Sequence, residues 1–276
     1  MKSEGESIVN GYPADALAIG NRGLHYGDGL FETLAAVEGR PLLWDRHWQR
    51  LAEGCEQLGL AAPPADAVRA AIAQLSGKER FCAVKIMVTR AAHGRGYRPS
   101  GRAIDWIVSA YPWEPPAEER RTGVLAVWCR LRLAAPNACA GMKTLNRLEQ
   151  VLAQREWDPP VREGLMQDPQ GFVIEGTMSN IFVTETGRLA TPPLTDCGIA
   201  GVMRAAVIDA ALEHAIPVCI EPLTRARIEQ ADELFLTNSL IGIWPVRNLA
   251  GHAFAVGPLS RRLLAILRER GDAAFS

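Results

Sequence analysis

Lys143 is a lysine whose neighbours in the sequence suit covalent chemistry. The residues after it, 144–152, carry apolar side chains at helical spacing. We therefore predict a helix that begins directly after Lys143 and turns Leu145, Leu148, Val151 and Leu152 inward. A lysine held at the end of a rigid element, in a partly desolvated pocket, loses its proton more readily and can form a Schiff base. The alternative is an ordinary surface charge at a helix start.

Two further stretches could bind small molecules. Gly201 directly precedes a helix predicted to begin near Val202, and free amides in the first turn of a helix attract phosphate. The same description fits any ordinary helix start. The segment 91–101 is rich in glycine and basic residues, which is typical of a solvated loop or of a substrate-binding loop.

Composition limits the functional classes. The chain has 276 residues, 48% of them hydrophobic, which is enough for one large or two ordinary domains. Its 30 basic and 31 acidic residues give a net charge of -1, so we expect neither nucleic acid nor a membrane as a partner. Six scattered cysteines without metal-ligand spacing indicate no metal site and a reducing compartment. With no apolar signal segment or membrane span in the sequence, we expect a cytoplasmic protein.

The elements that must position these residues mix hairpins and helices. In the first half of the chain the patterns predict hairpins over 8–12 and 30–43, helices over 44–58 and 65–75, strands over 81–89 and 104–111, and a glycine-rich loop over 21–29. The prolines and charges of 112–121 favour a linker. We therefore expect a smaller N-terminal domain over 1–115, a linker over 116–121, and a larger C-terminal domain over 122–276.

The second half is predicted to contain several antiparallel hairpins. Its expected strands are 124–133, buried on both faces, then 163–167, 171–176, 180–184, 188–191, 218–221 and 234–237, with helices from 202 and over 258–268. The absence of a regular βαβ alternation favours an α+β fold over a doubly wound sheet.

Seven motifs in order carry a resemblance to a known family. They are 25–32, 47–51, Lys143, 174–176 with 179–182, 191–193, 198–204, and 231–233 with 245–246. Over nearly its whole length the chain resembles the fold-type IV pyridoxal-phosphate enzymes, which include the branched-chain and D-amino-acid aminotransferases and the aminodeoxychorismate lyases. The resemblance implies a D-amino-acid-aminotransferase-like fold, with a smaller α/β domain and a larger domain whose sheet is rich in antiparallel strands.

The resemblance also implies how pyridoxal 5'-phosphate is held. Lys143 would form the Schiff base, and Glu175 would face the pyridine nitrogen and keep it protonated. The phosphate would be bound by Arg50, the amides of Val202 and Met203, and the Ser239 hydroxyl, with Ile199 packed against the ring. The alternatives are a surface salt bridge for Arg50, a turn-edge carboxylate for Glu175, and ordinary packing or turn formation for Ile199 and Ser239.

Other residues indicate which branch of the family the chain resembles. Aminotransferases of the branched-chain type place a tyrosine five residues after the lysine, where this chain has Leu148. Residues 141–152, together with Arg90 and 94–97, resemble the lyase branch instead. That resemblance implies conversion of 4-amino-4-deoxychorismate to 4-aminobenzoate and pyruvate in folate biosynthesis, with Lys143 as the proton acceptor. The alternatives are an aminotransferase for D-amino or branched-chain amino acids and a catalytically silent binding protein.

The substrate carries two carboxylates. Arg95, with Tyr97 nearby, is the candidate anchor for one of them. Tyr26 either lines the same pocket or packs as an ordinary aromatic. In the family the corresponding loop reaches the active site of a neighbouring subunit, so the resemblance also implies a homodimer.

Overall fold

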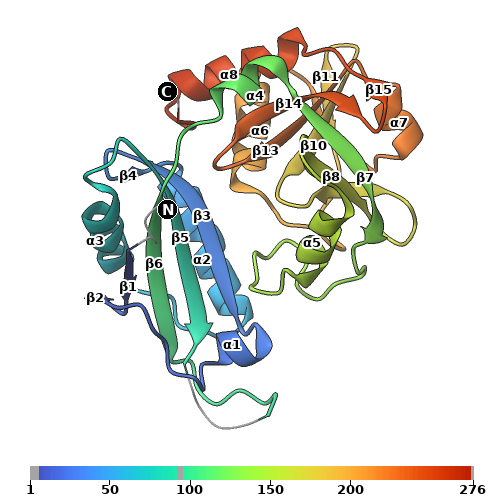
Figure 1. Ribbon diagram of the computed structural model, residues 1–276. Coiled ribbons are helices and arrows are strands. Elements are labelled where there is room, and N and C mark those ends of the chain that lie inside the picture. The colour runs from blue at the N-terminus through green and yellow to red at the C-terminus, as the bar shows by residue number, and fades with distance from the viewer. Residues whose placement is uncertain (1–5, 92–95, 275–276) are drawn as a thin grey trace. The chain divides into compact units, whose positions relative to one another are not determined.

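The computed structural model describes residues 6–91 and 96–274 and divides into two compact units. Unit 1 consists of Met1–Pro115 and Met142–Asn146, and unit 2 of Pro116–Gly141 and Arg147–Ser276. Each unit is built around its own sheet (Figure 1). The fold mixes helices with two sheets, as the sequence predicts.

The sheet of unit 1 is antiparallel throughout. Its strand order is β2 (Tyr12–Pro13), β1 (Ser7–Val9), β6 (Ile104–Pro112), β5 (Phe81–Arg90), β3 (Gly29–Val37) and β4 (Arg40–Pro41). The β1–β2 turn uses Asn10 at φ 51° and Gly11 at φ 90°, the left-handed conformations that a two-residue hairpin requires. Both hairpins predicted for this half are confirmed.

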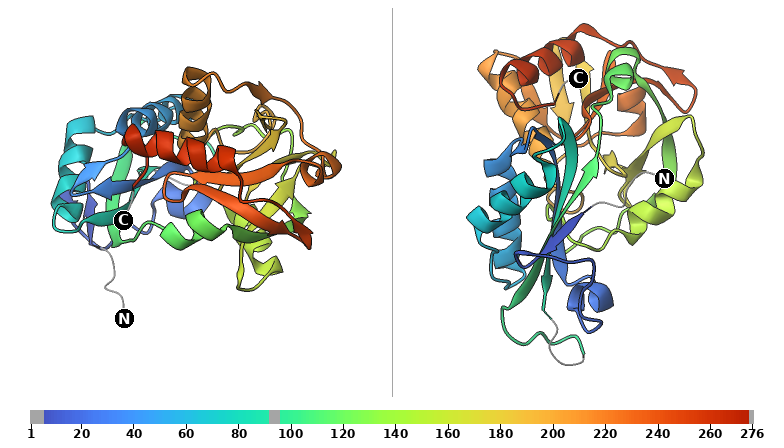
Figure 2. Two further views of the ribbon diagram at one scale, coloured as in Figure 1. Left: turned by 90° about the horizontal axis from the view of Figure 1, so that it is seen from above. Right: turned by 60° about the vertical axis from the view of Figure 1, so that its left-hand side comes forward.

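Helices α2 (Trp44–Gln57) and α3 (Ala65–Ser76) cover one face of this sheet, as Figure 2 shows. The alternation along β3 turns Leu30, Glu32 and Leu34 toward that face. A Cβ atom on Gly54 of α2 would lie 2.8 Å from a methyl group of Leu30, so glycine lets the helix approach the strand closely. A carboxylate, Glu32, therefore lies beneath α2.

The residues around Lys143 extend this sheet and do not begin a helix. The Phe31 amide donates to the Lys143 carbonyl (2.9 Å) and the Leu145 amide donates to Gly29 (3.0 Å), so 142–146 lies along the edge of β3. The helix α5 begins only at Leu148 and ends at Ala153. The predicted helix start is wrong, because distant backbone partners on β3 outweigh the local helical spacing.

The predicted inward face of that helix is also wrong for three of its four residues. Leu148, Val151 and Leu152 are 70%, 56% and 43% exposed. The short α5 instead buries Gln150 and Ala153. Three apolar side chains are thus left at the surface of unit 2.

A second correction concerns the loop predicted over 21–29. Within it, α1 (Arg22–Tyr26) forms a short helix that is capped at both ends. The Asn21 side chain accepts a hydrogen bond from the Gly23 amide, and Gly27 ends the helix at φ 64°. The glycine thus serves a helix C-terminus within the stretch predicted to be a loop.

Unit 2 is built on a mixed sheet. Its strand order is β12 (Val218–Ile220), β11 (Arg188–Thr191), β10 (Asn180–Glu185), β13 (Glu233–Asn238), β14 (Gly242–Leu249), β7 (Val124–Arg132), β8 (Val161–Gln167) and β9 (Val173–Gly176), with β15 (His252–Ala253) beside β14. The pairs β11–β12, β14–β7 and β7–β8 are parallel and the others antiparallel. Strand β7 buries Val124 and Ala126 but exposes Arg130, so burial on both faces is wrong.

The helices of unit 2 include two long ones, α6 (Val202–Glu213) and α8 (Pro258–Glu269), which pack on β13. Below them the rings of Phe182 and Phe235 stack with centroids 5.1 Å apart. The short elements η1 (Gln154–Glu156) and α7 (Arg225–Glu229) complete this unit. Strand β14 and helix α7 were not among the predicted elements.

The segment predicted as a linker is also helical. Helix α4 spans Ala117–Thr122 and belongs to unit 2. Its acidic residues lie in the first turn and its arginines in the last, which suits the helix dipole. Arg120 is buried and donates to the carbonyls of Leu240, Ile241 and Ala274. Charge in this stretch therefore anchors a helix to the unit.

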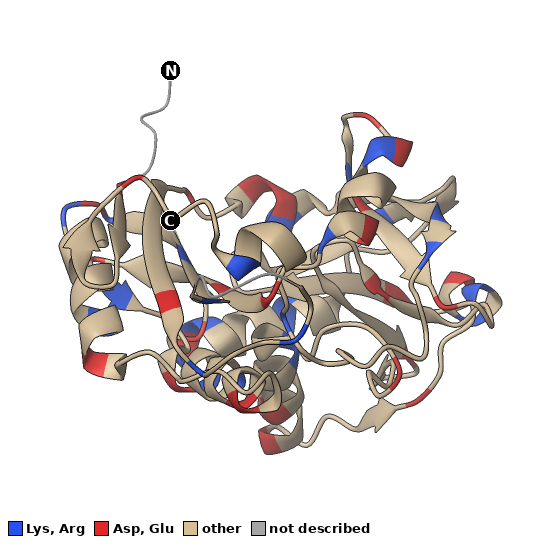
Figure 3. Ribbon diagram, turned by 90° about the horizontal axis from the view of Figure 1, so that it is seen from below, with Lys and Arg blue, Asp and Glu red and all other residues tan. Residues whose placement is uncertain are grey.

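Charges of both signs are interspersed along the ribbons of both units (Figure 3), in keeping with the net charge of -1. Within 6–91 and 96–274, none of the helices is long and apolar enough to cross a membrane. The same residues contain no cluster of histidine, cysteine and acidic side chains that could hold a metal ion.

Candidate active site

Lys143 is positioned by strand pairing in unit 1. Its neighbours Met142 and Thr144 are buried, and Lys143 itself is half-buried. Its Nζ atom lies 4.4 Å from the centroid of the Phe31 ring, on the face of β3 opposite Leu30. An amine that is half-buried over an aromatic ring, on a hydrogen-bonded backbone, has little conformational freedom.

Arg50 of α2 is fixed by the buried carboxylate of Glu32. Its Nε donates to Glu32 Oε1 (2.8 Å) and its Nη2 to Oε2 (2.5 Å), while His47 Nδ1 lies 2.7 Å from the same Oε2. Burial raises the pKa of Glu32, but the Arg50 charge and the hydrogen bonds from His47 and Arg50 outweigh it and lower that pKa to about 2. The guanidinium is therefore held by an ionised partner.

His47 is neutral in this cluster. Burial lowers its pKa, the hydrogen bond and the charge of Glu32 raise it, and the charges of Arg50 and Lys143 lower it, so that the pKa is lowered overall. Because a carboxylate only accepts hydrogen bonds, Nδ1 carries the proton and Nε2 is an acceptor. Among the described residues Nε2 has no hydrogen-bond partner.

The sequence predicts a site role for Arg50 but not for Glu32 or His47. A usable signal was present, because Glu32 alternates with Leu30 and Leu34 and so occupies a core-facing position. A buried carboxylate requires a cationic or hydrogen-bonding partner. A histidine and an arginine three residues apart on the next helix could have been predicted to supply it.

Of the three candidate substrate-binding residues, the structure describes Tyr26 and Tyr97. Arg95 lies outside the described residues. Tyr97 is 86% exposed, and its ring packs edge-on against Tyr26 with centroids 5.5 Å apart. Arg22, buried below them, donates to the carbonyls of Gly96 (2.8 Å) and Tyr97 (3.1 Å). Tyr26 and Tyr97 are therefore brought together at an anchored end of the loop.

Arg90 is held in place by one carboxylate and three backbone carbonyls. Its Nε donates to Asp28 (2.9 Å), and its other nitrogens donate to the carbonyls of Leu58, Gly59 and Gly101. Burial raises the pKa of Asp28, but the hydrogen bonds and charges of Arg90 and Arg22 lower it overall. Arg22, Asp28 and Arg90 thus form one ion cluster. This cluster binds the carbonyls of Gly96, Tyr97 and Gly101 in the loop that follows Arg90.

Glu175 lies at the end of β9 in unit 2 and is 3% exposed. Its Oε2 accepts a hydrogen bond from the Ile199 amide (2.8 Å), and the Ile199 carbonyl accepts one from Asn180 Nδ2 (2.9 Å). Ile199 also forms a bridge with Gly141, which precedes Lys143 by two positions in the chain. Glu175 and Ile199 are thus in direct contact. Asn180, which has no predicted role, binds the backbone carbonyl of Ile199.

The start of α6 is open. Its N-cap, Gly201, offers no side-chain cap, so the first-turn amides of Val202 and Met203 have no acceptor within the helix. A Cβ atom at Gly201 would lie 1.8 Å from Asn180 Oδ1, so a larger residue would displace this packing. Asn180 pairs with Thr237, and Ser239 follows Thr237 by two positions in the turn after β13. The sheet register thereby brings Ser239 to the end of the sheet that faces the α6 start.

Arg147, four residues after Lys143 in the sequence, is half-buried in unit 2. Burial lowers its pKa, and the negative charges of Glu175 and Glu149 act in the opposite direction. A cation is therefore part of the electrostatic environment of Glu175.

These residue types fit pyridoxal phosphate. Unit 1 holds an amine and a fixed guanidinium, and unit 2 holds a buried carboxylate beside an uncapped helix start. An amine can bind an aldehyde, a carboxylate can pair with a protonated ring nitrogen, and amides with a guanidinium can bind a phosphate.

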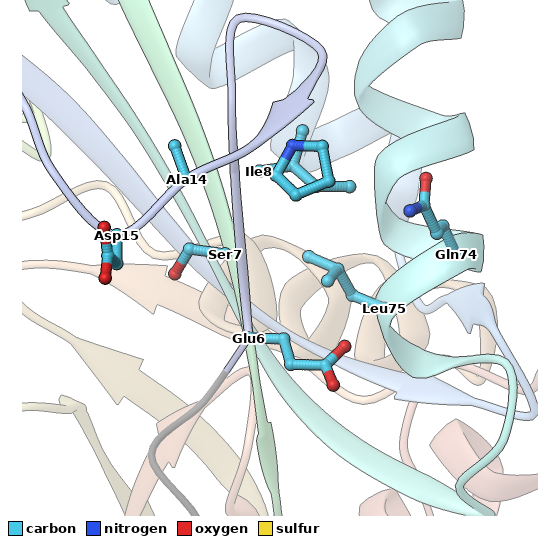
Figure 4. Close-up of a pocket in the computed structure, with 8 residues that line it drawn as sticks. Glu6, Ser7, Ile8, Ala14, Asp15, Gln74 and Leu75 are labelled. Carbon is cyan, nitrogen blue, oxygen red and sulfur yellow. The ribbon is translucent and has the colours of Figure 1, made fainter.

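A separate hollow of about 440 Å³ lies beside β1, β2 and α3 of unit 1 (Figure 4). It is lined by Glu6, Ser7, Ile8, Pro13, Ala14, Asp15, Gln74 and Leu75. None of the predicted site residues lines it.

Comparison with known proteins places this geometry in context. The family described as Amino-transferase class IV matches residues 29–249. The chain is 32% identical to an aminodeoxychorismate lyase of Vibrio harveyi, covering 92% of this chain and 97% of that protein. It is 31% identical to a putative branched-chain-amino-acid aminotransferase of Methanocaldococcus jannaschii, covering 90% and 88%. The crystal structure of 4-amino-4-deoxychorismate lyase from Pseudomonas aeruginosa superposes with a TM-score of 0.90 at 42% identity, covering 96% and 99%.

Proposed function

Because the chain belongs to the class IV aminotransferase family, we propose that it is a pyridoxal-phosphate-dependent carbon–oxygen lyase that converts 4-amino-4-deoxychorismate to 4-aminobenzoate and pyruvate. The observation that carries this proposal is the 42% identity, over 96% of the chain, to a solved lyase of that name. Leu148, in place of the tyrosine of branched-chain aminotransferases, supports the same branch.

Pyridoxal 5'-phosphate is the cofactor of this enzyme family. We assign Lys143 to its covalent binding, Glu175 to its ring nitrogen, and Ile199 to packing on its ring. Its phosphate is assigned to Arg50, the amides of Val202 and Met203, and the Ser239 hydroxyl. The uncapped α6 start supports this assignment, because its first-turn amides can donate to an anion. The Glu32 carboxylate holds the positively charged Arg50 guanidinium in one orientation, which suits an electrostatic role toward the phosphate.

When bound, the pyridoxal ring accepts the electron pair released at the substrate carbon. Lys143 Nζ takes the proton from C4 of the substrate, and its ring contact with Phe31 restrains the amine for that transfer. The Glu175 carboxylate keeps a proton on the ring nitrogen. The bond between the ring carbon and the enolpyruvyl oxygen then breaks. The released enolpyruvate takes up one proton to become pyruvate, which balances the proton removed from C4, and the aromatic amine forms without a keto-acid acceptor.

For substrate binding we propose Arg95 and Tyr97, with Tyr26 lining the same pocket. The contact of Tyr26 with Tyr97 supports pairing these two rings. Arg95→Ala should raise KM about tenfold or more with the cofactor retained, since one charge-assisted carboxylate contact is lost. Arg98→Ala, an exposed arginine on the same loop, is the matched control, and equal KM values for the two variants would remove Arg95 from the site.

We further propose a cytoplasmic homodimer. The exposed side chains of Leu148, Val151 and Leu152 support a partner surface on α5. The six cysteines, all described and all unpaired, support a reducing compartment. Light scattering of the full chain tests the dimer, and a monomer at micromolar concentration would contradict it.

The second candidate function is aminotransfer, because the chain is 31% identical to a putative branched-chain aminotransferase. It predicts a keto acid formed from an amino acid with 2-oxoglutarate or pyruvate as acceptor. A binding protein without catalysis is the remaining alternative. The purified protein should be yellow, and borohydride should fix the cofactor to Lys143; a colourless protein that cannot be reconstituted would exclude both enzymes.

The decisive experiment is turnover of 4-amino-4-deoxychorismate with detection of 4-aminobenzoate and pyruvate in equal amounts. Lys143→Ala should lower kcat about a thousandfold or more, because both covalent binding and proton transfer are lost. Lys85→Ala is the matched control, since Lys85 also lies over the Phe31 ring, at 5.1 Å. Formation of a keto acid without 4-aminobenzoate would favour the aminotransferase.

A further inference from the structure

A buried glutamate, Glu163 of β8, organises the turn between β9 and β10. Its side chain is fully buried and accepts five hydrogen bonds. Oε1 accepts from the amides of Gly164 and Thr177 (both 2.9 Å) and from the Thr177 hydroxyl (2.5 Å). Oε2 accepts from the Met178 amide (3.2 Å) and the Ser179 hydroxyl (2.7 Å). One carboxylate thus binds each of residues 177–179.

The turn is built to receive this carboxylate. The Gly176 amide donates to the Ser179 carbonyl (2.7 Å), which closes the turn. A Cβ atom on Gly176 would lie 2.4 Å from Ser179 Oγ and 2.8 Å from Glu163 Cδ, so a side chain there would expel the carboxylate. On the far side, Gln154 donates to the Thr177 hydroxyl (2.7 Å), which directs the hydroxyl proton toward Glu163.

The residues on either side of this turn, Glu175 and Asn180, both form hydrogen bonds with the backbone of Ile199. Glu175 precedes the turn and accepts from the Ile199 amide at 2.8 Å. Asn180 follows the turn and donates to the Ile199 carbonyl at 2.9 Å. Any movement of 176–179 therefore moves both partners of the Ile199 backbone.

We propose that Glu163 is a positioning residue for the cofactor site, acting through the turn to set the Glu175 carboxylate and the Ile199 backbone. The proposal rests on the proposed function, because Glu175 and Ile199 are assigned there to the cofactor ring. Glu163 itself is assigned no contact with cofactor or substrate. Its carboxylate determines where the acid that faces the ring nitrogen lies.

The same unit contains a matched carboxylate with a structural role. Glu233, on β13, is 4% exposed and accepts hydrogen bonds from the amides of Leu259 (2.9 Å) and Ser260 (3.0 Å) and from the Ser260 hydroxyl (2.7 Å). These donors belong to the first turn of α8. Glu233 thus stabilises a helix start with the same chemistry but without contact to Glu175 or Ile199.

The test compares Glu163→Gln with Glu233→Gln in the full chain. Hydrogen exchange of backbone amides without cofactor gives the first readout. In Glu163→Gln the amides of Thr177, Met178 and Ile199 should exchange about tenfold or more faster, since a buried acceptor for the Met178 amide is lost. In Glu233→Gln the increase should be confined to Leu259 and Ser260.

The second readout is the dissociation constant for pyridoxal 5'-phosphate, measured by the absorbance of the bound cofactor. Glu163→Gln should raise it about tenfold, and Glu233→Gln should change it less than twofold. If Glu163→Gln is too unstable to purify, Ser179→Ala removes one donor to the same carboxylate and should give a smaller shift in the same direction. Unchanged exchange of the Ile199 amide in Glu163→Gln, or in Ser179→Ala where that variant replaces it, overturns the proposal. An equal change of the dissociation constant in Glu163→Gln and Glu233→Gln overturns it as well.

The two readouts separate this proposal from the function on which it rests. A wild-type chain that does not bind pyridoxal 5'-phosphate contradicts the proposed function. The exchange of Ile199 without cofactor still decides whether Glu163 positions the Ile199 backbone.

Discussion

Glu32 in unit 1 and Glu163 in unit 2 are both buried carboxylates, but they are stabilised by different partners. Glu32 is 1% exposed and is bound by the side chains of Arg50 and His47. Glu163 is fully buried and is bound by amides and hydroxyls of the turn between β9 and β10. The first carboxylate fixes a cationic side chain, and the second fixes a stretch of backbone.

The two environments change the pKa in opposite directions. At Glu32 burial raises the pKa, but the Arg50 charge and hydrogen bonds lower it to about 2. At Glu163 burial raises the pKa more than the hydrogen bonds from Thr177 and Ser179 lower it. A cation close to a buried carboxylate therefore compensates desolvation more completely than neutral donors do.

The largest expected effect is that of Glu32→Gln. It leaves the Arg50 guanidinium without its anion, and losing one partner of a buried pair costs about 3–5 kcal/mol. Glu163→Gln keeps most of the hydrogen bonds that neighbouring groups donate to residue 163, so it should lower the free energy of unfolding by about 1–3 kcal/mol. Urea unfolding of both variants measures the difference, and equal costs would show that cations and neutral donors stabilise the two sites alike.

The pH dependence should differ in sign between the two sites. The stabilisation by Glu32 is present above the ordinary glutamate pKa of 4.5 and is lost as pH falls through the lowered pKa of about 2, a loss on the order of 3 kcal/mol. The difference between wild type and Glu32→Gln should therefore shrink on acidification. For Glu163, with its raised pKa, the difference from Glu163→Gln should shrink as pH rises. Parallel pH profiles of unfolding free energy would contradict this.

A smaller effect is expected for Thr177→Val. The variant removes a hydroxyl that donates to Glu163 and accepts from Gln154, which should cost about 1–2 kcal/mol. Thr122→Val is the control, since that hydroxyl donates to a backbone carbonyl at an exposed site. Thermal unfolding that ranks the two variants equally would mean that the hydroxyl contributes little to the carboxylate.

The smallest effect is expected for Arg121→Ala. Arg121 pairs with Glu118, but both side chains are about two-thirds or more exposed, at 71% and 67%. An exposed pair of this kind contributes less than about 0.5 kcal/mol. Its neighbour Arg120, which is buried against three carbonyls, is the contrasting position, and Arg120→Ala should destabilise clearly more. Similar unfolding midpoints for the two variants would weaken the distinction between exposed and buried charge.

Local signals in the sequence predicted the elements that depend on neighbouring residues. The hairpin at Asn10-Gly11 and the helix from Trp44 are examples, because turn geometry and helical spacing are local properties. The edge pairing of Lys143 with β3 was missed, since its partners at Gly29 and Phe31 lie more than a hundred residues away. The exposure of Leu148 was missed for a similar reason, because the spacing of apolar residues cannot show which face another element covers.

Most of the candidate site residues were predicted from the family resemblance, and few from the spacing and chemistry of the residues themselves. Spacing alone gave Lys143 and the α6 start as candidates, whereas Arg50, Glu175 and Ser239 came from the resemblance. The hydrogen bond between Glu175 and Ile199 joins residues 24 positions apart. Glu163 was read only as the start of a strand, because nothing local indicates that its carboxylate binds a turn 14 residues further on.

The assignment of Met142–Asn146 to unit 1, between stretches of unit 2 on both sides, has an evolutionary consequence. The chain passes between the units at residue 115, at 141 and again at 146, so no single crossover in the gene can exchange one unit intact. A recombinant joined at 115 would pair its lysine segment with a β3 edge from another ancestor. The Lys143 segment and β3 are therefore expected to be inherited together, which constrains how this fold can diversify by shuffling its halves.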